Sequence, residues 1–558
     1  MQQILTLVVV MSIQDPVGVS GQSPHEQHAT WIGKVQFALS MLQVVAVSPA
    51  VLVSLGFVTL IGGLLVYLFV IRPALSPLRV IPGPKPSHWI FGSLGEIINT
   101  KWSDGKFPEP HLSWVKKFGG IYCYRSILDL RVLITDPEAL KHVFTTNGEN
   151  YPRAKAVRAF LRGLIGGDGL LSTEGKTHTH QRKMLMPHFG FGKIKDFVEV
   201  FSTHANELCQ ELKPLADQPN TSVDLYSYFT KLTLDIIGVS AFGFHFNALS
   251  TGSPVVDAME LLMSPPSMFY LVGKNFIPTF RSWPLPRLIN EHEAKKMLYQ
   301  TVDDVIAAKL KSTRDVNRPV DLVDLMLDEN AHVEHKVTAE EARTHVMTFI
   351  LAGHETTSTT LSWVFTLFAQ HPQIEAMARE EARAVVAASG TIGWKSLGDL
   401  RLITACIQET LRLYPTVAAL APRVADQDDF LPMSDGKQIF VPKGTVIAIS
   451  TAAMHRNPKY WSQPDVYLPD RFVEGTDAFL ADKALRNGQG NTYFYMPFSA
   501  GAKNCIGMRF AMAELQVVVA NLLLHYSFRL TDQAIVHPKM TGVSIKPVNL
   551  DMTIHSVA

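Results

Sequence analysis

The strongest constraint on this chain is a cysteine in a glycine-containing loop that leads directly into an apolar helix. Residues 497–507 read Pro-Phe-Ser-Ala-Gly-Ala-Lys-Asn-Cys-Ile-Gly, and residues 508–526 are apolar at helical spacing. Gly501 and Gly507 permit backbone turns that a side chain would obstruct, and the amino end of the helix favours an ionised sulfur at Cys505. A lone cysteine is usually an inert buried residue. The spacing of the phenylalanine, the glycines and the cysteine favours a thiolate ligand to a metal instead.

A second motif lies inside a long apolar helix that is predicted to begin with a capping box at residues 338–341. Residues 352–357 read Ala-Gly-His-Glu-Thr-Thr. Glycine within a helix costs about 1 kcal/mol relative to alanine, so Gly353 indicates that something approaches the backbone closely. Ala352 and Thr356 share a helix face, so the Thr356 hydroxyl can donate to the Ala352 carbonyl or point towards a ligand. A kinked core helix is the alternative.

Two charged motifs follow further along the chain. Glu409 and Arg412 are three residues apart, which places them on one face of a helix where they can pair. Such pairs lie mostly on protein surfaces and contribute little. Residues 469–472 read Pro-Asp-Arg-Phe and supply a further arginine, Arg471. These two motifs are informative only together with the cysteine loop and residues 352–357, because the order of all four motifs can be compared with known families.

In that order, the motifs resemble those of the cytochrome P450 monooxygenases. Cys505 stands in the place of the axial ligand to the haem iron. The family usually has an arginine two residues before this cysteine, where this chain has Lys503. A lysine still supplies a positive charge for a haem propionate, but without the forked geometry of arginine. The resemblance also implies that Glu409, Arg412 and Arg471 form a structural network rather than a catalytic group.

The resemblance assigns the catalytic residues to the helix that contains residues 352–357. In the family this segment crosses the distal face of the haem. Thr356 matches the threonine that helps deliver protons during oxygen activation, and Glu355 matches the adjacent acid that feeds this relay. The resemblance therefore implies oxygen activation as the chemistry.

Three further residues match family positions that contact the haem propionates. Arg423 lies a short way past the Glu409 helix, where the family often has an arginine. Arg182 matches a retained arginine, and His178 stands where the family has a tryptophan four residues earlier. His178 and Arg182 are one helical turn apart, and an imidazole N–H can donate as an indole N–H does. A surface arginine and an ordinary histidine are the alternatives.

Composition fits a large enzyme and excludes some partners. The chain has 558 residues, with 51 Lys and Arg against 50 Asp and Glu, and a net charge of +1. Because no long basic block occurs, nucleic acid is not an implied partner. The four cysteines, which are Cys123, Cys209, Cys406 and Cys505, are too widely spaced for a disulfide framework or a zinc-like cluster. A reducing compartment fits this pattern.

The amino-terminal region predicts a membrane anchor. No charged residue occurs between Lys34 and Arg72, and residues 50–71 are almost continuously apolar. As a helix this stretch would span about 33 Å, which is enough for the bilayer core. A buried core helix is the alternative. Basic residues follow the span, so the positive-inside rule places the bulk of the chain in the cytosol. Residues 37–47 are too short to cross alone and could lie along the membrane interface.

We therefore expect four segments. Residues 1–48 are a leader of unknown role that matches a cleaved signal peptide poorly. Residues 49–71 are a transmembrane anchor and residues 72–86 a stiff proline-rich hinge. Residues 87–558 are a single catalytic domain with the cytochrome P450 fold, which is mainly α with small β-sheets.

Shorter signals predict individual elements of that domain. Strand-like alternation occurs at residues 120–135, 438–449 and 543–554. A helix is expected to begin at Asp136-Pro137-Glu138. Residues 474–492 are polar and are expected to form a surface loop.

The expected function is that of a haem-thiolate monooxygenase that inserts one atom of O2 into an apolar organic substrate. The resemblance implies electrons from NADPH through a separate flavoprotein reductase in the same membrane, with the protein anchored in the endoplasmic reticulum. The style of the sequence resembles fungal members, which points to secondary metabolism, with a terpenoid or steroid-like substrate, or to xenobiotic oxidation.

Two other functions stay open at this stage. A haem-thiolate isomerase or dehydratase would need no reductase, but such enzymes often lack the acid and threonine pair that stands here at Glu355 and Thr356. A non-catalytic haem-binding membrane protein would keep Cys505 without needing Thr356. Turnover of oxygen and NADPH with a reductase separates these functions from the monooxygenase.

Overall fold

A computed structural model describes most of the chain and divides it into two compact units. The units are residues 1–74 and residues 75–558. Most of the expected leader, including residues 37–47, lies outside the described residues. The described residues are 33, 36, 49–218, 221–264, 266–311, 321–327, 337–541 and 543–557.

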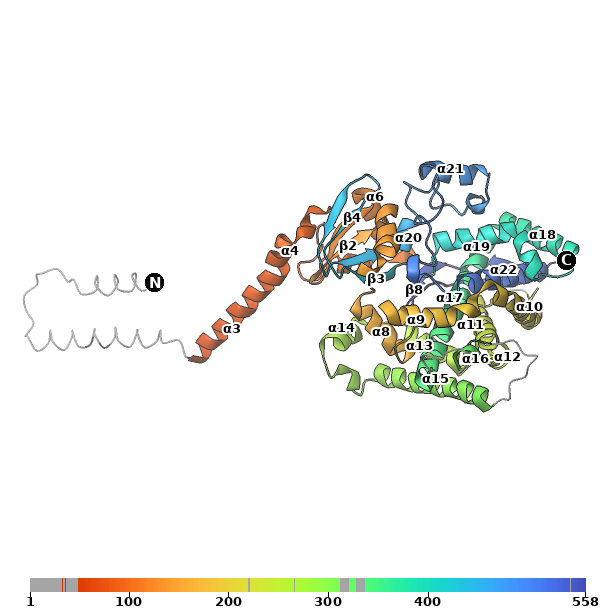
Figure 1. The fold of residues 1–558 in the computed structure, drawn as a ribbon, viewed down its shortest axis with the longest axis horizontal. Helices are drawn as coiled ribbons and strands as arrows, with labels where there is room; N and C mark the ends of the chain where they lie inside the picture. The colour runs from red at the N-terminus through yellow and green to blue at the C-terminus, as the bar shows by residue number, and fades with distance from the viewer. Residues whose placement is uncertain are drawn as a thin grey trace, which may run out of the picture. The chain divides into compact units, whose positions relative to one another are not determined.

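The first unit contains a long apolar helix. It consists of α3 (Pro49–Val66), a π-helical turn (Tyr67–Ile71) and α4 (Arg72–Leu75), shown in red in Figure 1. The stretch Val51–Leu75 is long and apolar enough to cross a membrane, and none of its most apolar window is buried. The helix α22 (Met508–His525) meets the same criteria of length and composition, but most of it is buried in the core of the second unit. Val51–Leu75 is therefore the candidate membrane span.

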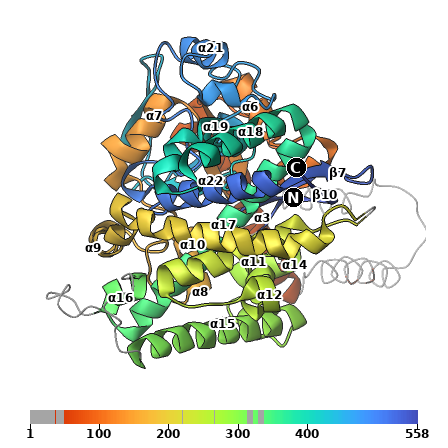
Figure 2. The same cartoon turned by 90° about the vertical axis from the view of Figure 1, so that its right-hand side faces the viewer.

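Helices make up most of the second unit, as predicted, and Figures 1 and 2 show them stacked around α17 and α22. Short 3-10 and π-helical turns connect several of them. The α-helices are α5 (Leu94–Asn99), α6 (His111–Phe118), α7 (Pro137–Lys141), α8 (Lys155–Ile165), α9 (Gly175–Leu185), α10 (Phe191–Leu212), α11 (Leu225–Ile237), α12 (Ala248–Thr251), α13 (Pro254–Met263), α14 (Met268–Phe276), α15 (Pro286–Lys311), α16 (Leu322–Leu327), α17 (Ala339–Gln370), α18 (Pro372–Ser389), α19 (Arg401–Leu413), α20 (Thr451–Met454), α21 (Asp477–Leu485) and α22.

The strands form four small sheets in the described part of the chain. The largest has the order β1-β2-β6-β3, in which β2 and β6 are parallel and the other neighbours antiparallel. The other sheets are the antiparallel pairs β4-β5, β7-β10 and β8-β9. The strands are β1 (Ile121–Ser126), β2 (Asp129–Ile134), β3 (Leu420–Val424), β4 (Asp429–Pro432), β5 (Gln438–Val441), β6 (Val446–Ile449), β7 (Tyr526–Leu530), β8 (His537–Met540), β9 (Ile545–Val548) and β10 (Met552–Ser556).

Several local signals in the sequence are confirmed. The capping box of α17 forms in both directions between Thr338 and Glu341. Asp136 caps α7 by accepting hydrogen bonds from the backbone of Glu138 and Ala139. The three regions of strand-like alternation all contain strands. These signals depend on nearest neighbours along the chain, so local sequence was sufficient to find them.

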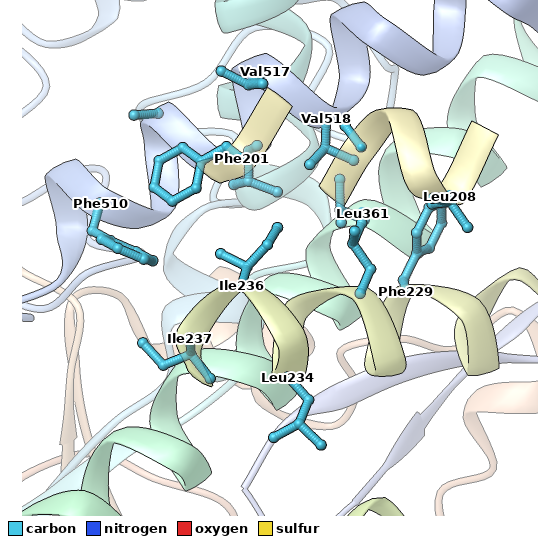
Figure 3. Close-up of a cluster of buried hydrophobic side chains, with 14 of the residues drawn as sticks. Phe201, Leu208, Phe229, Leu234, Ile236, Ile237, Leu361, Phe510, Val517 and Val518 are labelled. Atoms are coloured by element: carbon cyan, nitrogen blue, oxygen red, sulfur yellow. The ribbon is translucent and has the colours of Figure 1, made fainter. Parts of the chain in front are cut away.

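The core forms where four helices meet. α17 runs through the middle of the second unit and packs against α11 and α22, while α10 packs against α11 and α22 (Figure 2). Figure 3 shows Phe201 of α10, Ile236 of α11, Leu361 of α17 and Phe510 of α22 gathered in one buried cluster. Burying a side chain of this size contributes about 1.5–3 kcal/mol. Because α22 begins three residues after Cys505, this core fixes one end of the cysteine loop.

A buried charge network links α19 to the region around α21. Glu409 accepts hydrogen bonds from Arg412 at 2.7 and 2.8 Å and from Arg471 at 3.1 Å. Arg471 also donates to Asp482 at 2.6 Å, and Arg486 lies 3.5 Å from the same carboxylate. The expected structural network of Glu409, Arg412 and Arg471 is therefore present, and it also includes Asp482 and Arg486.

The expectation of a surface loop at residues 474–492 is wrong in part. The segment contains α21, and Asp482 on that helix is 1% exposed. The guanidinium group of Arg486 also lies 4.0 Å from the ring centre of Trp461. The polar composition of the segment predicted exposure, but Asp482 and Arg486 are buried because they belong to the charge network with Arg471.

Asp482 gives a direct test of this network. We expect Asp482→Ala to destabilise the protein by about 3–5 kcal/mol, because it leaves the buried Arg471 guanidinium without one of its two carboxylate partners. The free energy of unfolding in denaturant measures this loss. Glu474→Ala, which removes an exposed acid of the same segment, is the matched control. Equal stability of the two variants would show that Asp482 does not hold the network.

Several buried or half-buried histidines are kept neutral by the fold. Burial lowers the pKa of His111, His188 and His345 to about 4, and that of His455 to about 3. His455 also accepts a hydrogen bond at Nε2 from the backbone N–H of Met496 at 2.8 Å, which requires that nitrogen to be unprotonated. An unfolded chain would bind protons at these positions below about pH 6.5.

This difference predicts how stability depends on pH. The contribution of these histidines is fully present above pH 6.5 and is lost as pH falls towards 4, because the unfolded state then binds more protons. Each such histidine should lower the free energy of unfolding by about 1.4 kcal/mol per pH unit in this range. Denaturant unfolding between pH 7.5 and 5 measures the slope. His455→Gln should reduce it, whereas His525→Gln, at an exposed position, should not. A stability that rises on acidification would contradict the prediction.

Candidate functional site

The cysteine loop is closed by backbone contacts. The N–H of Cys505 donates to the carbonyl of Phe498 at 2.9 Å. Gly501 has φ of 69°, and a Cβ there would overlap the carbonyl oxygen of Phe144. The expectation that Gly501 permits a turn which other residues would obstruct is confirmed. Gly507 has a φ of −88°, which other residues also adopt, so its backbone conformation does not require glycine.

Cys505 presents a free thiol at the start of α22. The residue is exposed, and Gly507 between it and the helix is the helix cap. Protein atoms packed around the sulfur remove water from it and raise the pKa of the thiol, while the N–H of Gly507 and the charge of Arg182 oppose that rise. The expected stabilisation of the thiolate by its surroundings is therefore present but is outweighed by this desolvation. A cationic ligand at this position would reverse the balance.

Arg182 holds the loop from the neighbouring helix. It lies on α9, and its two terminal nitrogens donate to the Asn504 carbonyl at 2.7 Å and to the Asn504 side-chain oxygen at 2.6 Å. Asn504 immediately precedes the cysteine. Sequence reasoning selected Arg182 but missed Asn504, whose adjacency to Cys505 was the available signal.

The other basic residues expected at the site share one cavity. His178, Arg423 and Lys503 all line a cavity of about 1160 Å³, which is formed by α9, β3, the cysteine loop and the segment around Phe144. Cys505 and Thr356 are not among its lining residues. The structure therefore brings three of the sequence-predicted residues together and links Arg182 to them through the same loop.

Lys503 is engaged by an acid that sequence reasoning did not select. Its ammonium group forms an ion pair with Glu174, which also accepts a hydrogen bond from Arg153 at 2.8 Å. Arg153 in turn donates to backbone carbonyls of residues 170, 171 and 173. Glu174 directly precedes α9, so this chain of contacts ties the cysteine loop to the helix that carries His178.

Arg423 has a different environment. Its residue is 5% exposed, its guanidinium carbon lies 4.9 Å from the centre of the Phe144 ring, and its Nε has no hydrogen-bond partner among the described residues. Burial and the nearby Arg153 lower the pKa of Arg423 to about 10. A buried guanidinium with an unsatisfied N–H is unfavourable unless an acceptor binds beside it.

His178 is held neutral in the same cavity. Burial is the main cause that lowers its pKa to about 4, and the positive charges of Arg153 and Lys503 act in the same direction. His178 is 4% exposed and lies one turn before Arg182 on α9, as predicted. A neutral imidazole still has one N–H to donate.

On α17, the Thr356 hydroxyl donates to the Ala352 carbonyl at 2.7 Å, which is one of the two arrangements expected. The helix is continuous from Ala339 to Gln370. The close approach expected at Gly353 is real, but a Cβ there would lie 2.9 Å from Ile237 of α11. Gly353 therefore serves helix packing, and the inference of a ligand at its backbone is not needed.

Glu355 lies next to Thr356 along the chain but points elsewhere. Its Oε1 accepts hydrogen bonds from the hydroxyls of Thr541 at 2.8 Å and Ser544 at 2.7 Å. Glu355 lines a second cavity of about 490 Å³, which Thr356 does not line. Thr541 and Ser544 are distant in sequence, and no local motif marked them.

These residues fit a haem group. The free thiol of Cys505 can ligate iron, and the unsatisfied Nε of Arg423 lies with His178 and Lys503 in one cavity that could receive two propionates. Carboxylates are the acceptors that a buried guanidinium requires. The donor set and the cavity thus fit the chemistry of a haem group.

Comparisons with known proteins agree with this geometry. Cytochrome P450 4A14 of Rattus norvegicus is 31% identical over 480 residues, which cover 83% of this chain and 87% of that protein. Cytochrome P450 4F3 of Homo sapiens is 30% identical over 512 residues, which cover 88% and 94% respectively. The resemblance to fungal members stays a prediction. The family described as Cytochrome P450 matches residues 82–554, and the chain therefore belongs to the cytochrome P450 family.

Proposed function

We propose that this haem-thiolate monooxygenase acts with Cys505 as the axial ligand and inserts one oxygen atom of O2 into an apolar organic substrate. Membership of the family establishes the haem-thiolate monooxygenase class and a reductase as the electron source. The observation that carries the ligand assignment is the free Cys505 thiol at the start of α22. When bound, haem with a thiolate ligand supplies oxygen activation and O–O cleavage.

Four basic or neutral donors are proposed to bind the haem propionates. Arg423 supplies its unsatisfied Nε–H, and His178 supplies one imidazole N–H. Arg182 acts beside the ligand while it holds Asn504. Lys503 contributes positive charge from its ion pair with Glu174, so its contact with a propionate competes with that pair.

Thr356 and Glu355 are proposed to manage protons. The Thr356 hydroxyl donates to Ala352 and keeps its oxygen lone pairs available to accept a hydrogen bond. Glu355 is a carboxyl group held by two hydroxyls at the edge of a polar cavity, which suits the exchange of protons with water. The presence of both the acid and the threonine favours oxygen activation over haem-thiolate isomerisation.

The remaining proposals concern the membrane and the partner. We assign residues 1–48 to a leader, residues 49–71 to a single membrane anchor, residues 72–86 to a hinge and residues 87–558 to the catalytic domain. The apolar helix Val51–Leu75 supports the anchor. We place it in the endoplasmic reticulum with the catalytic domain in the cytosol, where NADPH-cytochrome P450 reductase in the same membrane would supply electrons. An apolar substrate would reach such a site from membrane lipid.

The substrate is proposed to be terpenoid or steroid-like, from secondary metabolism, or a xenobiotic. The support is the apolar character of the side chains that the family places around the substrate. Leu351 is a buried aliphatic side chain on α17, and Val417 is half-buried beside β3. Such a lining selects apolar molecules without defining the position of oxidation.

Cys505→Ser tests the proposed function. The reduced wild-type protein in membranes should give the red-shifted carbon monoxide difference band of a haem-thiolate protein, and the variant should lose it, because a serine hydroxyl does not supply a thiolate ligand. NADPH-dependent oxygen consumption with a reductase should be lost in parallel.

Cys406→Ser is the matched control, since Cys406 is a buried thiol on α19 outside the loop. It should keep the band. A wild-type protein that is folded and loaded with haem but lacks the red-shifted band would refute ligation by Cys505.

Arg182→Ala tests how the loop is held. Loss of the charged group that donates two hydrogen bonds to Asn504 should weaken haem binding by about 1.5–3 kcal/mol. At about 1.4 kcal/mol per factor of ten, haem should dissociate roughly 10- to 100-fold faster. Transfer of haem to an apoprotein acceptor measures that rate. Arg182→Lys should lie between, because it keeps the charge without the fork.

Lys195→Ala removes an exposed charge from α10 and is the control for net charge. Its haem dissociation rate should match the wild type. If Arg182→Ala also matches the wild type, the contact with Asn504 does not determine haem retention.

A further inference from the structure

The second cavity has a polar lining that includes residues of α17. It lies among α11, α13 and the β8-β9 hairpin, and we call it the Glu355 cavity. Its volume of about 490 Å³ leaves ample room for several waters, since one water needs about 10–15 Å³ of such space. Polar residues of its lining include Tyr226, Thr230, Glu260, Glu355 and Lys546. A cavity of this size and polarity supports ordered water.

The turn between β8 and β9 holds Glu355 by one oxygen. Thr541 and Ser544 both donate to Oε1, and their hydroxyls also lie 2.8 Å from each other. The turn is braced by its own backbone, since the Thr541 N–H donates to the Ser544 carbonyl at 2.8 Å. No described residue donates a hydrogen bond to Oε2, so this oxygen is available to water in the Glu355 cavity.

A path of polar groups leads from this carboxyl to bulk solvent. Glu260 of α13 is 65% exposed and pairs at 3.1 Å with Lys546, whose side chain is 16% exposed. The Lys546 ammonium also lies 4.0 Å from the centre of the Tyr226 ring. Glu355 itself is 7% exposed. Exposure thus decreases in steps from the surface acid to the buried acid.

Helix geometry separates Glu355 from Thr356. Successive residues on an α-helix point about 100° apart, and the two side chains have different partners, the β8-β9 turn for Glu355 and the Ala352 carbonyl for Thr356. A proton that travels from Glu355 to Thr356 must therefore pass through water or through a rotation of the carboxyl side chain.

We propose that Thr541 and Ser544 are positioning residues that keep Glu355 at the inner end of the Glu355 cavity, and that protons enter the active site through this cavity. This inference rests on the proposed function. Hydroxylation takes up two electrons and two protons for each O2, and the electrons come from the reductase. The Glu355 carboxyl releases a proton towards Thr356 and regains one from cavity water, which is replenished by bulk solvent between Glu260 and Lys546.

Removal of the two hydroxyls tests the positioning role. With the reductase and NADPH but no added substrate, Thr541→Val and Ser544→Ala should each slow NADPH oxidation about tenfold, a part of the roughly 10²- to 10⁴-fold that a positioned acid supplies. The ratio of rates in H2O and D2O should rise in both variants. Thr541→Ser keeps the hydroxyl and should restore both values.

Two controls separate positioning from a structural role. Ser227→Ala deletes a hydroxyl that lines the same cavity without touching Glu355, so its rate and isotope ratio should match the wild type. All variants should retain the carbon monoxide band. Unchanged isotope ratios in both Thr541→Val and Ser544→Ala would overturn the positioning role, even if both variants lost thermal stability.

Accessibility of the Glu355 cavity is tested without turnover. Thr230 is 5% exposed and lines the cavity, so Thr230→Cys in the folded holoprotein should react with a small cationic methanethiosulfonate reagent, while the buried native thiols Cys209 and Cys406 should not. Absence of labelling at residue 230 would overturn the proton route. Absence of the carbon monoxide band in wild type would instead overturn the proposed function.

Discussion

The structure depends on the placement of one sulfur atom. Cys505 must stand at the start of α22 with its thiol accessible, and the loop that carries it has little freedom. The Gly501 backbone lies against the Phe144 carbonyl, the Cys505 N–H is bonded to Phe498, and Asn504 is held by Arg182. Phe144 and Arg182 lie hundreds of residues before the loop in the sequence. The packing of α22 against α10 and α17 is therefore needed to bring the loop and its supports together.

The cavity lined by His178, Arg423 and Lys503 carries a cluster of charged groups close to the cysteine loop. Arg153, Arg423 and Lys503 lie close enough to influence one another, and Glu174 is the acid that pairs with two of them. Arg423 is left with a buried N–H that no described residue accepts. Three basic groups with one acid leave a net positive charge at this cavity. A partly buried positive charge is unfavourable by itself and attracts carboxylates strongly. The fold therefore favours binding of an anionic group near the Cys505 thiol.

The sequence was most informative where the signal was local or belonged to a long-range motif. The α17 capping box, the Asp136 cap and the strand regions depend on neighbouring residues, and their prediction was confirmed. The role of Asp482 could not be predicted, because an acid in a polar segment looks exposed until Arg471 is found beside it. Gly353 marked a close approach correctly, but only the structure shows that Ile237 makes it. Contacts between distant segments that belong to no known motif have no signature in a single sequence.

The same limit applies to Glu355 and Thr356 on α17. The resemblance to the family assigned both residues a shared role in proton delivery. The structure separates them, because the β8-β9 turn takes Glu355 and the helix backbone takes Thr356. A helix that presents an acid to one side and a hydroxyl to another can isolate a reactive site from bulk water while keeping it supplied with protons. This separation favours selective chemistry, since water that reached both groups freely would also reach the reacting atoms.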